Sequence, residues 1–194
     1  KTGNVFASTT LKFIQRKLSL TADKEDVDLF WFESNTPYNV KIPVVTTLLN
    51  QISRAHKYKG QYTALIACSL RAIFEISIDR LKKKHKYIFN HTKTIKAEST
   101  KWDVMQVIAF MKKNNTLRTD MAKAIDIEYT TLTNLLDMTG YCEAIEGAHL
   151  GAHKSTSHLT NSRIENIAKY ASNFSVFCDC LINNFTESTI KKYV

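Results

Sequence analysis

The sequence predicts an all-α protein, a helical bundle that follows a small helical or irregular N-terminal extension. Apolar residues recur at helical spacing through most of the 194 residues. Only five glycines and two prolines are present, and no apolar run reaches the roughly 18 residues of a membrane span. Collagen-like, low-complexity and membrane-spanning chains are therefore excluded.

The extension is predicted to cover residues 1–58. A short amphipathic helix, capped by a hydroxyl side chain at positions 8–10, is indicated by Phe6, Leu11, Ile14 and Leu18. An acidic connector leads to residues 29–32, either a short strand or an apolar plug. Pro43 suits the first position of the next helix. Its apolar face would be Val44, Leu48, Leu49 and Ile52.

The bundle itself is predicted over residues 59–185. Residues 61–78 are apolar nearly all round, which is typical of a helix at the centre of a bundle. This helix continues through Leu81 into Lys82–Lys84, whose charges suit the negative end of its dipole. Residues 90–99 form a polar connector.

Three further helical regions complete the bundle. Ser99 or Thr100 would cap a helix over 102–111, and a shorter helical pair would occupy 120–125 and 129–138. Residues 146–158 are expected to form a turn because they contain Gly147 and Gly151. Thr160 would cap a last long helix that reaches Ile182, and residues 186–194 would be a tail.

Arg71 and Glu75 lie one helical turn apart within the apolar helix. Burial of either charge would cost several kcal/mol unless the two paired and filled their remaining hydrogen bonds. We expect His153 to hydrogen-bond Glu75, because Gly151 and Ala152 allow the turn to approach the helix closely. Arg71, Glu75 and His153 would then form a structural polar clamp between two helices.

These residues resemble a known family. An Arg-x-x-x-Glu helix, here Leu70 to Glu75, and a later Gly151-Ala-His153 turn before a capped final helix are similar to the HEPN-like helical domains of prokaryotes, over about residues 61–182. The resemblance implies a dimerising module of a larger anti-phage defence or mobile-element conflict protein, with an upstream domain.

The catalytic branch of that family implies an alternative function. Its members are metal-independent ribonucleases with an Arg-x(4–6)-His motif, and Arg80 with His85 has this spacing. An arginine would hold the phosphate and a histidine would move the proton. The match lies in the central helix, however, and His153 has no arginine four to six residues before it. A catalytic role for Arg80, His85 or His153 is therefore not favoured.

The basic residues are concentrated. Residues 80–123 hold twelve Lys or Arg and three acidic residues, so this segment alone accounts for the net charge of +9. Such a segment is typical of a nucleic-acid partner, DNA or RNA, or of a solvated helix end. The expected contact residues are Lys82, Lys83, Lys84, Lys86, Lys93, Lys96, Lys112, Lys113, Arg118 and Lys123.

A helix-turn-helix over residues 118–138 is a second alternative. Asp126-Ile127 falls at its turn, although glycine is usual there. The second helix offers chiefly Thr130, Thr133 and Asn134, without a basic residue, so base readout would be thin. An ordinary helical hairpin explains the pattern equally well.

No metal or cofactor is expected. His149 and His153 have i,i+4 spacing with His158 nearby, but the glutamate of a zinc-protease motif is absent and the glycines disfavour a regular helix. Cys178 and Cys180 point to nearly opposite sides of a helix. Free cysteines of this kind favour a reducing, cytoplasmic location.

Overall fold

The structure, a computed structural model, describes residues 29–30, 32, 38–58, 62–89, 99–153 and 159–193, with 151–153 described by their backbone alone. These residues confirm the all-α class and contain no strand. The elements are α1 (Pro43–His56), α2 (Thr63–Lys84), the 3-10 helix η1 (Lys86–Phe89), α3 (Thr100–Lys113), α4 (Asn115–Ala124), α5 (Tyr129–Leu135), α6 (Met138–His153), α7 (Asn161–Asn184) and α8 (Glu187–Lys191). The helix expected near residues 6–18 and the connector 90–98 lie outside the described residues.

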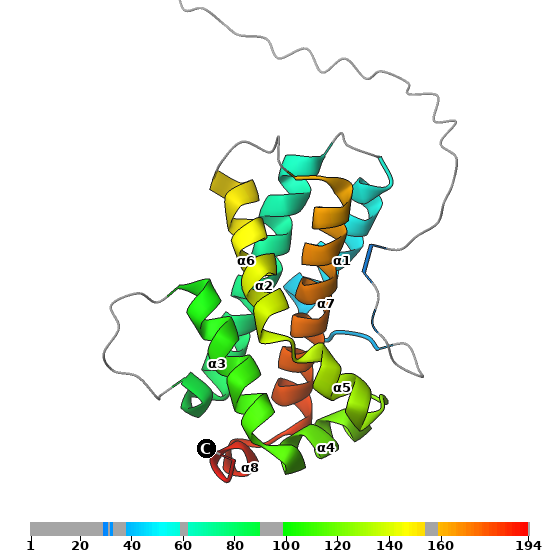
Figure 1. The fold of residues 1–194 in the computed structure, drawn as a ribbon. Helices are drawn as coiled ribbons and strands as arrows, with labels where there is room; N and C mark the ends of the chain where they lie inside the picture. Colours follow the sequence, from blue (N-terminus) through cyan, green and yellow to red (C-terminus); the bar gives the residue numbers. More distant parts are fainter. Residues whose placement is uncertain are drawn as a thin grey trace, which may run out of the picture.

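Helices α2 and α7 pack against each other at the centre of the bundle (Figure 1). All eleven residues from 171 to 181 are buried, and α7 packs mainly against α2 and α6. The rings of Phe74 on α2 and Phe174 on α7 lie 5.6 Å apart. We expected α2 to be the helix buried all round, and this was wrong, since Leu65, Glu75 and Arg80 are exposed. The polar residues within α7 concealed its burial from the sequence pattern.

Three of the predicted helix starts are confirmed, whereas the helix predicted over 120–125 begins earlier, at Asn115. The Ser99 hydroxyl accepts a hydrogen bond from the Trp102 N–H at 3.2 Å, and the Thr160 hydroxyl accepts one from the Arg163 N–H at 3.3 Å. Pro43 occupies the first turn of α1. The apolar face of α1 differs in one position, because Val45 is buried and Val44 is 46% exposed.

Residues 146–153 are helical, whereas we expected a turn there. Gly147 is buried against α7, where a Cβ would lie 2.9 Å from Ile167 Cδ1. The glycine thus allows α6 to approach α7 closely instead of ending the helix. At Gly140, a Cβ would collide with Tyr170, whose hydroxyl donates a hydrogen bond to Asp137 at 2.8 Å.

The segment before α1 lies across the bundle. Leu29 is buried and Phe32 packs edge-on against Phe177, so the apolar plug is the alternative that the structure supports. Helix α1 packs along α2, and its buried Val45 and Ile52 belong to the same core.

Two elements complete the lower end of the bundle. The turn between α4 and α5 holds Asp126 with φ of 55°, in the left-handed region that an aspartate tolerates better than most residues. The expected C-terminal tail contains α8, which is capped by Thr186 and buries Ile190.

No helix among the described residues has the length and hydropathy needed to cross a membrane.

Candidate nucleic-acid interface

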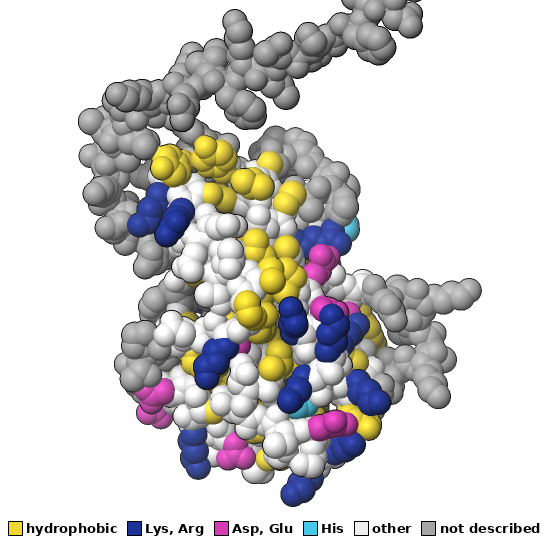
Figure 2. All heavy atoms as spheres, turned by 180° about the vertical axis from the view of Figure 1, so that it is seen from behind, with side chains coloured by type: hydrophobic (Ala, Val, Ile, Leu, Met, Phe, Trp, Pro, Cys, Tyr) yellow, Lys and Arg dark blue, Asp and Glu magenta, His cyan; other side chains and the backbone are white. Residues whose placement is uncertain are grey.

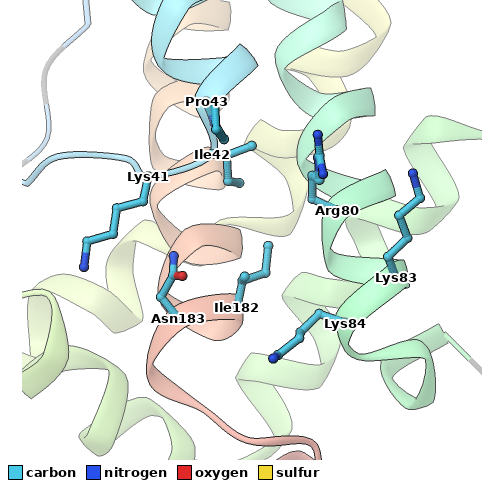
Figure 3. Close-up of a pocket in the computed structure, with 8 residues that line it drawn as sticks. All are labelled: Lys41, Ile42, Pro43, Arg80, Lys83, Lys84, Ile182 and Asn183. Atoms are coloured by element: carbon cyan, nitrogen blue, oxygen red, sulfur yellow. The ribbon is translucent and has the colours of Figure 1, made fainter.

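A cavity of about 310 Å³ opens between the start of α1, the last turns of α2 and the end of α7 (Figure 3). We call it the basic concavity, and its lining residues are Lys41, Ile42, Pro43, Arg80, Lys83, Lys84, Ile182 and Asn183. Lys84 extends from α2 towards α7, while Lys41 extends outward on the opposite side. The apolar side chains lie between these cations and form the floor.

Helical spacing brings three of the cations together. Arg80, Lys83 and Lys84 stand at i, i+3 and i+4 on α2, and residues so spaced share a face. The fourth cation, Lys41, comes from the segment before α1, far away in the sequence. All four side chains are exposed.

The position of Lys41 depends on a buried carboxylate. Asp179, fully buried on α7, accepts hydrogen bonds from the Lys41 backbone N–H at 2.8 Å and from the Tyr38 hydroxyl at 2.9 Å. Burial, together with the neighbouring Asp179 carboxylate, raises the pKa of Tyr38 far above its usual value. Both bonds hold the segment against α7, and they place Lys41 and Ile42 beside α2.

The charge of the basic concavity is not fully balanced. Lys83 pairs with Asp79 at 2.7 Å. Arg80, Lys84 and the Lys41 side chain form no ion pair within the described part of the chain. Even with Asp79 and the buried Asp179 counted, two positive charges remain in excess at this site.

Of the other predicted contact residues, those that the structure describes do not line the basic concavity. Lys82 turns to α3, where it pairs with Asp103 at 2.8 Å, and Lys86 lies over the Tyr87 ring. Lys112, Lys113, Arg118 and Lys123 lie at the end of α3 and on α4, and Lys93 and Lys96 lie outside the described residues. The back view in Figure 2 shows several Lys and Arg side chains beside apolar ones, with fewer acidic side chains.

A second depression, which we call the α2–α6 cleft, has a volume of about 590 Å³. It is lined by Arg71, Ser99, Thr100, Lys101, Ile145, Glu146, His149 and Leu150. Its charges are paired with each other: Arg71 with Glu75 at 2.7 Å, and Lys101 with Glu146. The latter contact raises the pKa of Lys101 and lowers that of Glu146.

The predicted clamp is changed in two respects. Arg71 and Glu75 do pair, but their side chains are 25% and 44% exposed, so the expectation that they are buried was wrong. The histidine that meets Arg71 is His149, whose Nδ1 lies 2.9 Å from Arg71 Nη1. The side chain of His153 is outside the described part, so its proposed role stays a prediction.

His85 is a structural residue in this fold. It follows α2 directly and is fully buried, and its Nε2–H donates to the Leu181 carbonyl at 2.9 Å. Burial lowers the pKa of the ring. Since Arg80 is exposed and His85 is not, the two do not present a joint Arg–His pair to a substrate.

The region predicted as a helix-turn-helix consists of α4, a turn and α5. Leu132 on α5 is buried, and Arg118 on α4 stacks over the exposed ring of Tyr129 at 5.4 Å. Helix α5 has only seven residues, and none of them is basic. The geometry fits a helical hairpin, and the DNA-binding interpretation stays a prediction.

Sequence reasoning missed Lys41 and Asp179, and it did not pair His149 with Arg71. A signal for Lys41 existed, since a lysine two residues before a proline at a helix start adds charge to the positive end of the helix dipole. Asp179 and His149 had no comparable local signal, because their partners lie on other helices. Comparisons with protein-family models, curated proteins and solved structures found no match to this chain. The HEPN-like resemblance therefore stays an expectation.

Proposed function

We propose that the protein binds nucleic acid through phosphate groups and that the basic concavity is its principal contact. The observation that carries this proposal is that Lys41, Arg80, Lys83 and Lys84 all stand around one cavity, with an ion pair only at Lys83 among the described residues. Cations without internal partners can neutralise phosphates and release counterions.

The start of α1 adds to this electrostatic field. Ile42 precedes the helix, and no side chain caps it. The first backbone N–H groups of a helix lack acceptors within the helix and carry a partial positive charge. Pro43 has no N–H, so these groups belong to Val44 and Val45, which directly follow the two residues, Ile42 and Pro43, that line the basic concavity. The positive end of the helix dipole nevertheless favours an anion there.

The test is a fluorescence-anisotropy titration with a labelled oligonucleotide at increasing salt. If phosphates dominate, affinity should fall by orders of magnitude between about 50 and 200 mM salt. An Arg80→Gln/Lys84→Gln double variant should weaken binding, and the slope of log Kd against log salt should fall by about 2.

A matched control removes two cations elsewhere. Arg163 and Lys169 are exposed on the first half of α7, and Lys169 lies about 21 Å along the helix from Asn183. The Arg163→Gln/Lys169→Gln variant has the same net charge as the first variant. Equal losses in both variants, or no binding at low salt, would contradict the proposal.

A ribonuclease is the alternative implied by the resemblance, and the burial of His85 disfavours its motif. We expect RNA incubated with the protein and EDTA to remain intact. Cleavage that a His149→Ala or His153→Ala change abolishes would establish the enzyme. Dimerisation, a DNA-binding hairpin and a defence role stay predictions.

A further inference from the structure

We infer that the basic concavity takes an unpaired nucleotide of a single strand, with its phosphate at the cationic rim and its base on the apolar floor. This inference rests on the proposed function. Its starting point is the division of the cavity into two chemically different parts. The rim is formed by the four cations, and the floor by Ile42, Pro43 and Ile182.

The floor is poorly suited to a partner that offers only phosphates. Ile42 is 4% exposed and Ile182 is half-buried, so the core holds both apolar side chains in place. A duplex stacks its bases inside and presents its backbone to such a surface, whereas an unpaired nucleotide presents both a charged group and the apolar face of its base. Single-strand sites combine a cationic groove with a surface on which bases pack, usually of aromatic side chains. Here Ile42, Pro43 and Ile182 offer an aliphatic surface instead.

The size of the cavity points the same way. A volume of about 310 Å³ lies at the lower end of the range for small-molecule pockets, which start near 300 Å³. Such a cavity suits one nucleotide. Its lining residues come from the segment before α1, the end of α2 and the end of α7.

Asn183 supplies an oriented polar group at the edge of the floor. Its amide Nδ2 donates to the Asp179 carbonyl at 3.0 Å, which determines the orientation of the side chain. Figure 3 shows the Asn183 oxygen on the side of Ile182. This oxygen is placed to accept a hydrogen bond from an amino or imino group of a base.

The experiment compares three anions of equal length on the unmodified protein at about 50 mM salt: a single-stranded oligonucleotide, its duplex and an abasic strand. We expect the single strand to bind at least about fivefold more tightly than either of the others, since removing the apolar face of even one base from water contributes roughly this much. Equal binding of all three would overturn this inference but leave phosphate binding intact. If none of the three oligonucleotides binds, both this inference and the proposed function are contradicted.

Two variants locate the effect. Ile182→Gln makes the floor polar, and it should weaken single-strand binding to the level of the abasic strand while binding of the abasic strand is unchanged. Leu150→Gln in the α2–α6 cleft, where Leu150 is 37% exposed, is the matched control and should alter neither. Circular dichroism confirms folding. A loss caused by Leu150→Gln but not by Ile182→Gln would overturn the assignment.

A competition with a free mononucleotide distinguishes two sources of the same chemistry. We expect it to displace the strand only at concentrations far above the strand's own nucleotide concentration, since neighbouring phosphates contribute to strand binding. Displacement at equal nucleotide concentration would overturn the inference and assign the basic concavity to a free nucleotide.

Discussion

The basic concavity and the α2–α6 cleft lie on opposite sides of α2, and they differ in whether their cations are paired with carboxylates. Arg80 and Arg71 are nine residues apart, which is two and a half helical turns. In the cleft, Arg71 and Lys101 each meet a carboxylate. In the concavity, Arg80 and Lys84 meet none among the described residues. The availability of a partner within the fold, and not the density of charge in the sequence, decides which cations remain for a ligand.

The two regions also differ in how they are held together. The concavity depends on the buried Asp179 and on the buried His85, both of which bond to groups across helices. The cleft depends on exposed ion pairs, which contribute little stability. We therefore expect substitutions beneath the concavity to affect folding, and substitutions in the cleft to have small effects.

The largest expected effect is on the free energy of unfolding of Asp179→Ala. The change leaves the Lys41 N–H and the Tyr38 hydroxyl without their acceptor, which should cost about 2 kcal/mol. Asp79→Ala, which removes an exposed partner of Lys83, should cost less than about 0.5 kcal/mol. Urea denaturation measures both, and equal losses would show that Asp179 does not hold the segment as described.

The next effect concerns binding after charge reversal at one cation on each side of α2. Lys84→Glu should reduce oligonucleotide affinity at least about tenfold at low salt, because it replaces a phosphate contact with a repulsive charge. Lys101→Glu changes the net charge equally but alters a side chain already paired with Glu146. It should alter affinity by less than about twofold. The reverse order would place the interface in the α2–α6 cleft.

A smaller effect is the pH dependence that His85 contributes. Burial lowers its pKa from the ordinary 6.5, so the unfolded chain binds more protons than the folded chain once the pH falls below 6.5. The contribution of His85 to the free energy of unfolding is therefore fully present above pH 6.5. It declines as the pH falls below that value, by at most about 1.4 kcal/mol per pH unit.

The control is His85→Gln, which keeps a donor for the Leu181 carbonyl and does not titrate. Urea denaturation at about pH 7.5 and about pH 5.5 should show a smaller loss in the variant than in the unmodified protein. If both lose the same free energy, another group accounts for the acid sensitivity.

Helical periodicity and caps were sufficient to predict the all-α class and the starts of α1, α3 and α7. They did not show which helix is the more completely buried. The stretch 61–78 at the start of α2 is apolar nearly all round in sequence, but it is α7 that buries Ser175 and Asp179 as well as its apolar residues. These polar groups find their hydrogen-bond partners only in the folded chain. Those of Asp179 come from the distant segment that contains Tyr38 and Lys41.

The basic concavity was only half predictable for the same reason. Lys83 and Lys84 stood out within the basic run, but Lys41 joins them only through Asp179. Lys82, next to Lys83 in sequence, turns to Asp103 instead. A linear run of charge on a helix is divided among several faces, so the sequence alone overstates the size of any one basic surface.

The smallest expected effect is the coupling between Arg71 and Glu75. If the pair were buried, removal of Glu75 would cost on the order of 3–5 kcal/mol. The exposed fractions of 25% and 44% indicate instead a coupling below about 1 kcal/mol, since solvent screens the pair. A double-mutant cycle with Arg71→Gln and Glu75→Gln, followed by urea denaturation, measures the coupling. A value above about 2 kcal/mol would mean that solvent does not screen this ion pair. The contrast between the exposed ion pairs of the α2–α6 cleft and the buried groups beneath the basic concavity would then not hold.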